Sequence, residues 1–180
     1  MMDQYRGFDQ LRTNELSVIR HGFWRPWFEL TDGQFCYGKL SYDGLWKVGA
    51  ILESAQKTWI IKSKGIFSRV LLINDTDGMQ IGTITPEIWS RKTMLSLNDG
   101  FEAVYLNKKV FTRTFSLINT QYGDLLNIKQ ESWKLKTPFK IFLEPDALKN
   151  IPNPPLLALL GINLVLQNQK KAAASAGVGG

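Results

Sequence analysis

The hydrophobic and polar positions follow one texture from residue 23 to about residue 143. Short runs rich in Val, Ile, Thr, Phe, Tyr and Trp are broken repeatedly by Gly, Asp, Asn and Ser. Such runs favour β-strands, and such interruptions are typical of turns. From 111 to 117, bulky side chains alternate with threonine and serine, which is the period of a strand with one buried and one wet face. The pattern predicts an all-β domain.

Asp-Gly pairs mark four of the expected turns, at 32–33, 43–44, 77–78 and 99–100. These pairs supply the positive φ angles that two-residue hairpin loops need. The runs between the breaks predict strands near 26–31, 34–41, 45–53, 57–63, 67–74, 79–85, 93–98, 102–107, 110–118, 125–131 and 133–144. These are eleven strands, or twelve if the last run divides at Pro138, and we expect them to form a meander of hairpins.

A different pattern follows between Pro152 and Lys171. Asn153 can cap the start of a helix, and Pro154 suits the first helical position. The large apolar side chains of this segment are Leu156, Leu157, Leu159, Leu160, Ile162, Leu164, Val165 and Leu166. Because they point in every direction around a helix, the helix must be surrounded. The apolar run spans about 16 Å, short of the roughly 30 Å of bilayer hydrocarbon, so the expected surround is protein.

The number of strands suggests how the helix is enclosed. About eight strands close a barrel that side chains alone can fill, whereas eleven or twelve leave room for a helix about 10 Å across. We therefore predict an all-β fold with one central helix: a closed antiparallel barrel of about twelve strands around a hydrophobic C-terminal α-helix. The barrel is expected over 23–171, with its helix at about 154–171. Residues 1–22 are expected to be irregular, and 172–180 to be a flexible tail.

The charge balance favours an acidic partner. The chain carries 22 Lys and Arg against 16 Asp and Glu, a net charge of +6. Anionic phospholipid or an acidic protein fits this balance, and nucleic acid is the less favoured partner because the cations are scattered. The single cysteine, Cys36, excludes an internal disulfide and is expected to be a buried strand thiol. Without an apolar secretory signal, we expect a cytoplasmic protein, peripheral at membranes if its partner is a lipid.

The sequence predicts no catalytic residues, no cofactor and no metal site. His21 is the only histidine, and it lies in a different expected element from Cys36, so no nucleophile and base can be paired. The segment 75–78 has the start of a calcium-loop pattern, but the third acidic position and the distal Glu are absent, and a hairpin turn explains it. We therefore expect a protein that is not an enzyme.

Basic residues close to apolar ones are the better candidates for a binding site. The candidates for binding an anionic ligand are Arg69, Arg91, Lys92, Arg113, Lys134, Lys136 and Lys140. Arg69 and Arg113 each share an expected strand face with apolar residues. If these faces point inward, each arginine needs a buried partner and is structural; if they point outward, they suit a lipid headgroup or a nucleic acid. Lys134, Lys136 and Lys140 lie on one late strand, which predicts a cationic stripe.

The Asp-Gly turns, the strand region from Trp133 to Leu143 and the apolar helix from Leu156 to Leu166 together resemble the tubby-like barrel superfamily. Within it the chain is most similar to the LURP-one-related proteins and, more distantly, to the phospholipid scramblases. The resemblance covers about residues 23–171 and implies a barrel filled by its last helix. Tubby proteins bind phosphoinositides through basic residues on the outside of the barrel. Scramblases carry cysteine-rich and proline-rich segments that this chain lacks.

Three hypotheses about function remain open. The first is a non-enzymatic binding module that engages an anionic lipid headgroup or another acidic partner through outward basic residues. The second is a barrel with a small-molecule cavity or a weak enzymatic site at one rim, built from turn carboxylates and His21. The third is a scramblase-like, membrane-associated protein that inserts its C-terminal helix into the bilayer.

Overall fold

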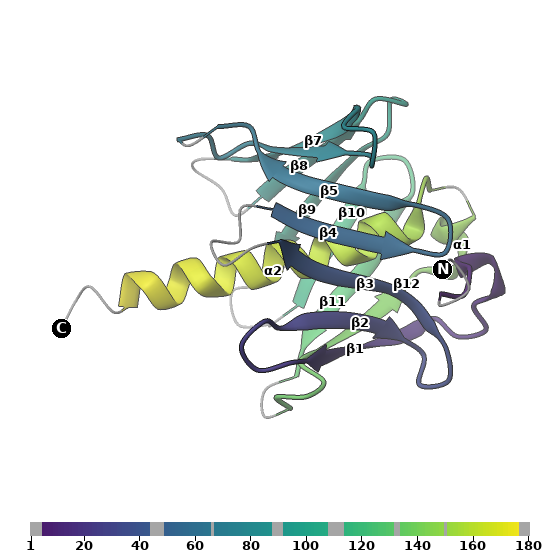
Figure 1. Ribbon diagram of the computed structural model, residues 1–180. Coiled ribbons are helices and arrows are strands. Elements are labelled where there is room, and N and C mark those ends of the chain that lie inside the picture. Colours follow the sequence, from purple (N-terminus) through teal and green to yellow (C-terminus); the bar gives the residue numbers. More distant parts are fainter. Residues whose placement is uncertain are drawn as a thin grey trace.

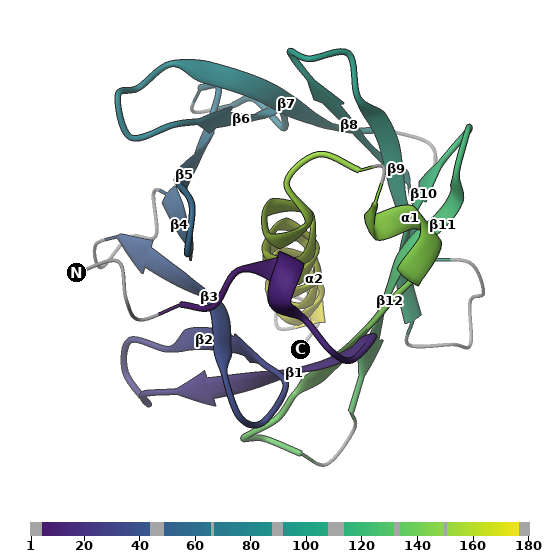
Figure 2. The same cartoon turned by 90° about the vertical axis from the view of Figure 1, so that its right-hand side faces the viewer.

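Twelve antiparallel strands close into a barrel around one long helix in the computed structural model, which describes residues 5–43, 49–65, 67–87, 92–107, 114–131, 134–149 and 151–176 (Figures 1 and 2). The strands are β1 (Glu15–His21), β2 (Trp27–Thr31), β3 (Cys36–Asp43), β4 (Gly49–Ser54), β5 (Thr58–Ser63), β6 (Leu71–Asn74), β7 (Gln80–Pro86), β8 (Lys92–Leu97), β9 (Glu102–Asn107), β10 (Thr114–Asn119), β11 (Gly123–Gln130) and β12 (Phe139–Leu143). A 3-10 helix, η1 (Phe8–Gln10), precedes them, and the helices α1 (Pro145–Leu148) and α2 (Pro154–Ala176) follow. The predicted all-β barrel with a central C-terminal helix is confirmed.

The first strand closes the barrel. β1 pairs with β2 and also with β12, so that Val18 lies opposite Leu30 on one side and Phe139 on the other. The prediction of an irregular segment over 1–22 is therefore wrong for β1. Only Leu16 and Val18 of this strand are buried, which is a weak pattern by itself, and the strand is specified largely by the two partners that it joins.

Three of the four Asp-Gly pairs lie in turns as predicted, but their loops are longer than two residues. Gly33, Gly78 and Gly100 all have positive φ angles, between 83° and 95°. The loops are 32–35, 75–79 and 98–101. The aspartate side chain organises such a loop by accepting backbone N–H groups within it, as Asp32 does twice at 2.8 Å. Gly44, from the remaining pair, lies outside the described residues.

α2 runs through the lumen of the barrel. Its residues from Pro155 to Leu164 are buried, including six of the eight large apolar side chains predicted to fill the core. Val165 and Leu166 are only partly buried because they lie near the end where the helix leaves the wall. α2 continues to Ala176, five residues past its predicted end. Among the described residues, no helix has both the length and the apolar character needed to cross a membrane.

Two glycines allow α2 to approach the wall closely. A Cβ atom at Gly161 would lie 2.5 Å from Ile128 Cδ1, and one at Gly38 of β3 would lie 3.1 Å from a leucine methyl group of α2. The hydroxyl of Tyr105 donates a hydrogen bond of 2.6 Å to the carbonyl oxygen of Leu157. α2 therefore packs firmly on the wall, mainly against β3, β4, β10 and β11.

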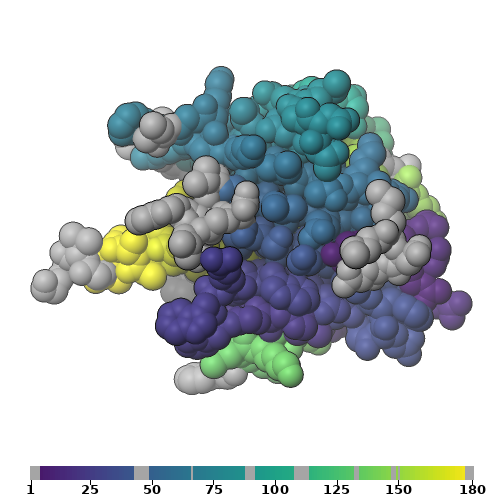
Figure 3. Space-filling view, in the orientation of Figure 1, coloured from purple at the N-terminus to yellow at the C-terminus, as the bar shows by residue number. Residues whose placement is uncertain are grey.

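The two ends of the barrel differ. At one end, which we call the closed end, Phe8 of η1 packs edge-on against Tyr37 with 5.7 Å between ring centroids, and η1 lies across the end of α2 (Figure 2). α2 emerges from the opposite end, which we call the exit end, and its last turns project beyond the wall (Figures 1 and 3). Because successive strands alternate in direction, the loops 22–26, 64–70 and 131–138 lie at the exit end, whereas the Asp-Gly loops described above lie at the closed end.

Candidate functional site

The structure resolves the position of five of the seven predicted cations. Exposed in loops at the exit end are Arg69, Lys134 and Lys136. Arg69 precedes β6 rather than lying on a strand, because a turn from Gly65 to Ser68 interrupts the expected run, and its exposure argues against the buried structural role. Lys92 is exposed at the first position of β8, also at the exit end. Outside the described residues lie Arg91 and Arg113.

The cationic stripe predicted on a late strand is wrong. The backbone bends before Pro138, which has no N–H for a strand ladder, so β12 begins only at Phe139 and the first two lysines of the stripe lie in a loop. Lys140 does lie on β12, where its ammonium group pairs with the carboxylate of Glu15 on β1. The hydrogen bond from Lys140 to Glu15 and the charge of that carboxylate raise the pKa of Lys140. This pair links β1 and β12, the strands that close the barrel. Lys140 therefore has a structural role in the barrel wall.

Large apolar side chains are exposed in the same exit-end loops. Phe23 and Trp24 are 80% and 89% exposed, Phe67 is 98% exposed, and Leu135 is 84% exposed. The large hydrophobic side chains exposed at the closed end are Phe35, Met79 and Tyr122, at 38% to 68%. Apolar side chains gain nothing from contact with water, so four of them at one end indicate a surface that interacts with something apolar.

Cations accompany these apolar side chains. Exposed beside them are Arg25, Lys64, Arg69, Lys134 and Lys136. We call these five cations, together with Phe23, Trp24, Phe67 and Leu135, the exit rim. Sequence reasoning missed the part of the rim at 22–26, because the aromatic pair there is recognisable as a hairpin loop only when β1 is known to be a strand. An aromatic dipeptide in a loop that should be polar is the signal that marks it.

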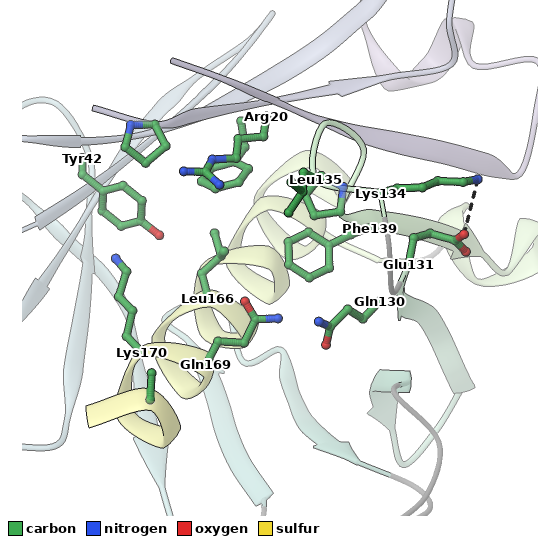
Figure 4. Close-up of a pocket in the computed structure, with 14 residues that line it drawn as sticks. Arg20, Tyr42, Gln130, Glu131, Lys134, Leu135, Phe139, Leu166, Gln169 and Lys170 are labelled. Carbon is green, nitrogen blue, oxygen red and sulfur yellow. Dashed lines mark ion pairs between the residues drawn. The ribbon is translucent and has the colours of Figure 1, made fainter. Parts of the chain in front are cut away.

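A cavity of about 810 Å³ opens beside α2 at the exit end, and we call it the rim cavity (Figure 4). It lies between α2 and the side of the wall formed by β1, β2, β3, β11 and β12. Its larger apolar lining residues are Pro26, Phe28, Leu135, Pro138, Phe139 and Leu166. Small-molecule sites in proteins typically have volumes of about 300–1,000 Å³ and mostly apolar walls, so the rim cavity has the size and lining of a binding site.

Arg20 places a charge on the inner face of the wall at the mouth of this cavity. Leu16, Val18 and Arg20 share the inner face of β1, and only Arg20 is exposed, because it is the last inner position before the open end. Within the described part of the chain, no hydrogen bond or ion pair holds its guanidinium group. Sequence reasoning missed Arg20 because it treated this segment as irregular; the alternation that begins at Leu16 is the signal that reveals it.

Tyr42 and Lys170 complete the polar side of the rim cavity. The ammonium nitrogen of Lys170 lies 4.5 Å from the centroid of the Tyr42 ring, and the Tyr42 hydroxyl donates a 3.2 Å hydrogen bond to Asn163 Oδ1. Burial raises the pKa of Tyr42, so the hydroxyl keeps its proton. Asn163 is fully buried, and its Nδ2 has no hydrogen-bond partner among the described residues. Figure 4 shows Arg20, Tyr42 and Lys170 along one side of the cavity.

The structure does not assemble a catalytic site from His21 and the turn carboxylates. His21 lies at the exit end outside the lumen, where its Nε2 contacts Glu29 Oε2 at 2.8 Å and its ring stacks on Trp27 at 3.9 Å. Asp32 and Asp99 lie in turns at the closed end, the opposite end of the barrel. Among the described residues, no group of three His, Cys, Asp or Glu side chains is placed to hold a metal ion.

Comparison of the chain with protein-family models, with curated proteins and with solved structures found no match. The exit rim and the rim cavity are therefore interpreted from their own chemistry, and the resemblance to tubby-like barrels stays a prediction.

Proposed function

We propose that the protein is a non-enzymatic binding module that attaches to anionic membrane surfaces through the exit rim. The observation that carries this proposal is that four exposed apolar side chains and five exposed cations lie in three loops at the end where α2 emerges. Cations attract anionic headgroups, and aromatic side chains suit the interface beneath the headgroups. A bilayer offers anionic headgroups to the cations and an apolar interface to the aromatic side chains, so it uses both sets.

The two sets have to act together to give useful affinity. Each Lys or Arg near an anionic surface contributes about 1 kcal/mol. Because Lys134 pairs with Glu131, the other four cations contribute about 4 kcal/mol, which corresponds to a Kd of about 1 mM. Physiological salt weakens this attraction further. Transfer of Trp24 or Phe67 out of water adds about 1.5 kcal/mol or more for each side chain, which is about tenfold in affinity. We therefore expect binding to require both the cations and the apolar tips.

The projecting part of α2 is compatible with this attachment. Its exposed residues beyond Gln169 are two lysines, one serine and several alanines, with no carboxylate. Lys170 and Lys171 thus add cations at the same end of the barrel. The proposal agrees in ligand class with the tubby-like proteins that the sequence resembles, but it uses the exit rim rather than basic residues on the outer wall.

Flotation of the full-length protein with vesicles tests the proposal. Vesicles of phosphatidylcholine alone are compared with vesicles that also contain phosphatidylserine, each at low and at physiological salt. The expected result is binding to the anionic vesicles that weakens as salt rises, because screening acts on the headgroup contacts. Binding to neutral vesicles regardless of salt would indicate insertion of the C-terminal helix and would contradict the proposal. Failure to bind either kind of vesicle would also overturn it.

A matched pair of charge variants separates the exit rim from net charge. The rim variant combines Arg69→Gln, Lys134→Gln and Lys136→Gln, and the control combines Arg12→Gln, Lys57→Gln and Lys149→Gln at the closed end. Both lose three charges. The rim variant is expected to bind anionic vesicles about 100-fold more weakly at low salt, and the control within a few-fold of wild type. Equal losses in the two variants would show that the rim has no special role.

A second pair tests the apolar contribution. Trp24→Ser removes an exposed side chain of the exit rim, and Met79→Ser removes one that is 68% exposed at the closed end. We expect Trp24→Ser to weaken flotation with anionic vesicles about tenfold and Met79→Ser to leave it unchanged. Wild-type binding by Trp24→Ser would restrict the interaction to charge and would argue against contact with the bilayer interface.

A further inference from the structure

We infer that the rim cavity binds one fatty acid or a similar single-chain carboxylate. This inference rests on the proposed function for the source of its ligand, because a membrane at the exit rim would supply fatty acids. It rests on the cavity itself for the chemistry of recognition, which combines an apolar wall, a cationic side and an opening at the exit rim.

The apolar wall of the cavity is suited to an alkyl chain. Phe28 and Phe139 are buried inner-face side chains of β2 and β12, and Leu166 faces them from α2. The volume of about 810 Å³ lies between these surfaces and opens at the exit end. An alkyl chain placed there would remove both its own surface and that of the wall from water. A sugar or a nucleotide would leave many of its polar groups without partners against the same wall.

The charge in the cavity favours an anionic headgroup. The guanidinium group of Arg20, which has no partner among the described residues, supplies this charge, and Lys170, whose ammonium group lies over the Tyr42 ring, is on the same side (Figure 4). The third cation, Lys134, has its ammonium group 3.4 Å from the carboxylate of Glu131, the acidic residue of the lining, so that pair is close to neutral. The guanidinium of Arg20 presents a planar fork that matches the two oxygens of a carboxylate. A cationic ligand would be repelled, and a neutral one would leave this side unused.

The opening of the cavity coincides with the exit rim. Leu135 both lines the cavity and is 84% exposed, and Lys134 before it also lines the cavity. Pro26, at the end of the neighbouring loop that carries Phe23 and Trp24, also lines it. A fatty acid leaving a membrane at the exit rim would therefore enter between two loops that contact the same membrane.

Displacement of a fluorescent fatty acid from the full-length protein, without vesicles, tests the inference. The probe is dansylundecanoic acid, and the competitors are saturated carboxylates from hexanoate to decanoate, together with decanol. We expect one site per chain and a gain in affinity of about fourfold for each added methylene group. Decanoate is expected to bind at least tenfold more tightly than decanol. Absence of a chain-length dependence, or equal affinity for decanoate and decanol, would overturn the inference.

Two exposed cations on the cavity wall are tested by Arg20→Gln and Lys170→Gln, with Lys62→Gln as a control on β5, near the same end but outside both the cavity and the exit rim. Each cavity variant is expected to weaken decanoate binding about tenfold and to leave decanol binding unchanged, because only the charged headgroup loses a partner. Lys62→Gln is expected to change neither affinity. Equal loss of decanoate and decanol in the cavity variants would refute the assigned headgroup contacts.

The location of the bound ligand in the rim cavity is tested by substitutions in the exposed part of α2, where they do not disturb the core. Ala173 lines the cavity and its neighbour Ala174 does not, and both are exposed. Ala173→Trp is expected to abolish binding of decanoate and decanol, whereas Ala174→Trp is expected to bind both as wild type does. Equal behaviour of the two variants would overturn the location.

Failure of this inference can be distinguished from failure of the proposed function. If vesicle flotation persists while the protein fails to displace the probe, the exit rim binds membranes and the cavity assignment is wrong. If decanoate binds with the expected chain-length dependence while flotation fails, the cavity assignment stands and the membrane proposal is wrong.

Discussion

The enclosure of α2 makes Leu160 the most informative position at which to perturb the fold. Leu160 has no exposed surface and lies in the middle of the buried part of α2. Leu160→Ala removes apolar contacts and leaves a cavity, a change that typically costs about 3–5 kcal/mol. The surrounding wall is a closed ring of paired strands that cannot move inward without breaking its hydrogen bonds, so we expect the upper half of the range, about 4 kcal/mol.

The effect on melting follows from the size of the chain. For a domain of this length, each kcal/mol lowers Tm by about 2–4 °C, so Leu160→Ala should melt about 8–16 °C below wild type. Leu160→Asp adds an unpaired carboxylate inside the barrel at a further cost of several kcal/mol, which exhausts a typical stability of about 5–15 kcal/mol. We therefore expect the aspartate variant to be unfolded or insoluble. Far-UV circular dichroism during heating, after measurement of the soluble yield, checks both variants.

The matched control is the same substitution at an exposed leucine. Leu135 is 84% exposed, and Leu135→Asp should leave the free energy of unfolding within about 0.5 kcal/mol of wild type. A Leu160→Asp variant that stays in solution and melts cooperatively at the wild-type temperature would show that Leu160 is not enclosed. That result would refute the enclosure of α2 by the barrel and the stability estimates that depend on it.

Three further predictions test other contacts. Asn163→Leu should raise the free energy of unfolding by about 1 kcal/mol, because it removes a buried N–H without a described partner and loses only one hydrogen bond, that from Tyr42. Urea titration measures this change, and a loss of stability would mean that Nδ2 is satisfied. Gly161→Val should lower the free energy of unfolding by about 1–3 kcal/mol, since even a Cβ atom there would lie 2.5 Å from Ile128 Cδ1. An unchanged urea midpoint would contradict the close packing of α2. Burial raises the pKa of Cys36 to about 11, so about one thiol in a thousand is ionised at pH 8. Alkylation by iodoacetamide should therefore be about 100-fold slower than for a free thiol at pH 8 and should quicken about tenfold per pH unit until about pH 11; rapid alkylation at pH 8 would contradict the assignment of an inert thiol.

Local chemistry made several elements predictable. α2 begins at Pro154 as expected, because proline suits the first turn and the apolar run that follows has no polar face to leave in water. The turns at Gly33, Gly78 and Gly100 are predictable because glycine accepts positive φ and aspartate bonds to the backbone of its own loop. The number of strands follows from the spacing of these breaks, and closure around a helix follows from that number.

Other elements depend on partners that are distant in the chain. β1 contains only two buried side chains, and it is a strand because β2 and β12 supply hydrogen bonds on both of its edges. Pro138 has the opposite effect on β12: it has no N–H group to donate to a neighbouring strand, and β12 therefore begins only after it. A local pattern cannot report either effect, because both depend on which backbone groups the fold places opposite each other.

Some features of the candidate site could likewise be predicted from the sequence, and others depend on the tertiary structure. The identity of Arg69, Lys134 and Lys136 as exposed cations follows from residue type, since such side chains are rarely buried. That their loops and Trp24 lie at the same end of the barrel follows only from the alternating directions of the strands. Arg20 illustrates the point most simply: alternation places it on one face with Leu16 and Val18, but only the closure of β1 against β12 makes that face the lumen beside α2. The sequence by itself determined the elements, because they arise from interactions between near neighbours. Only the tertiary structure decided which side chains share a surface, because that depends on strand direction and pairing across the whole chain.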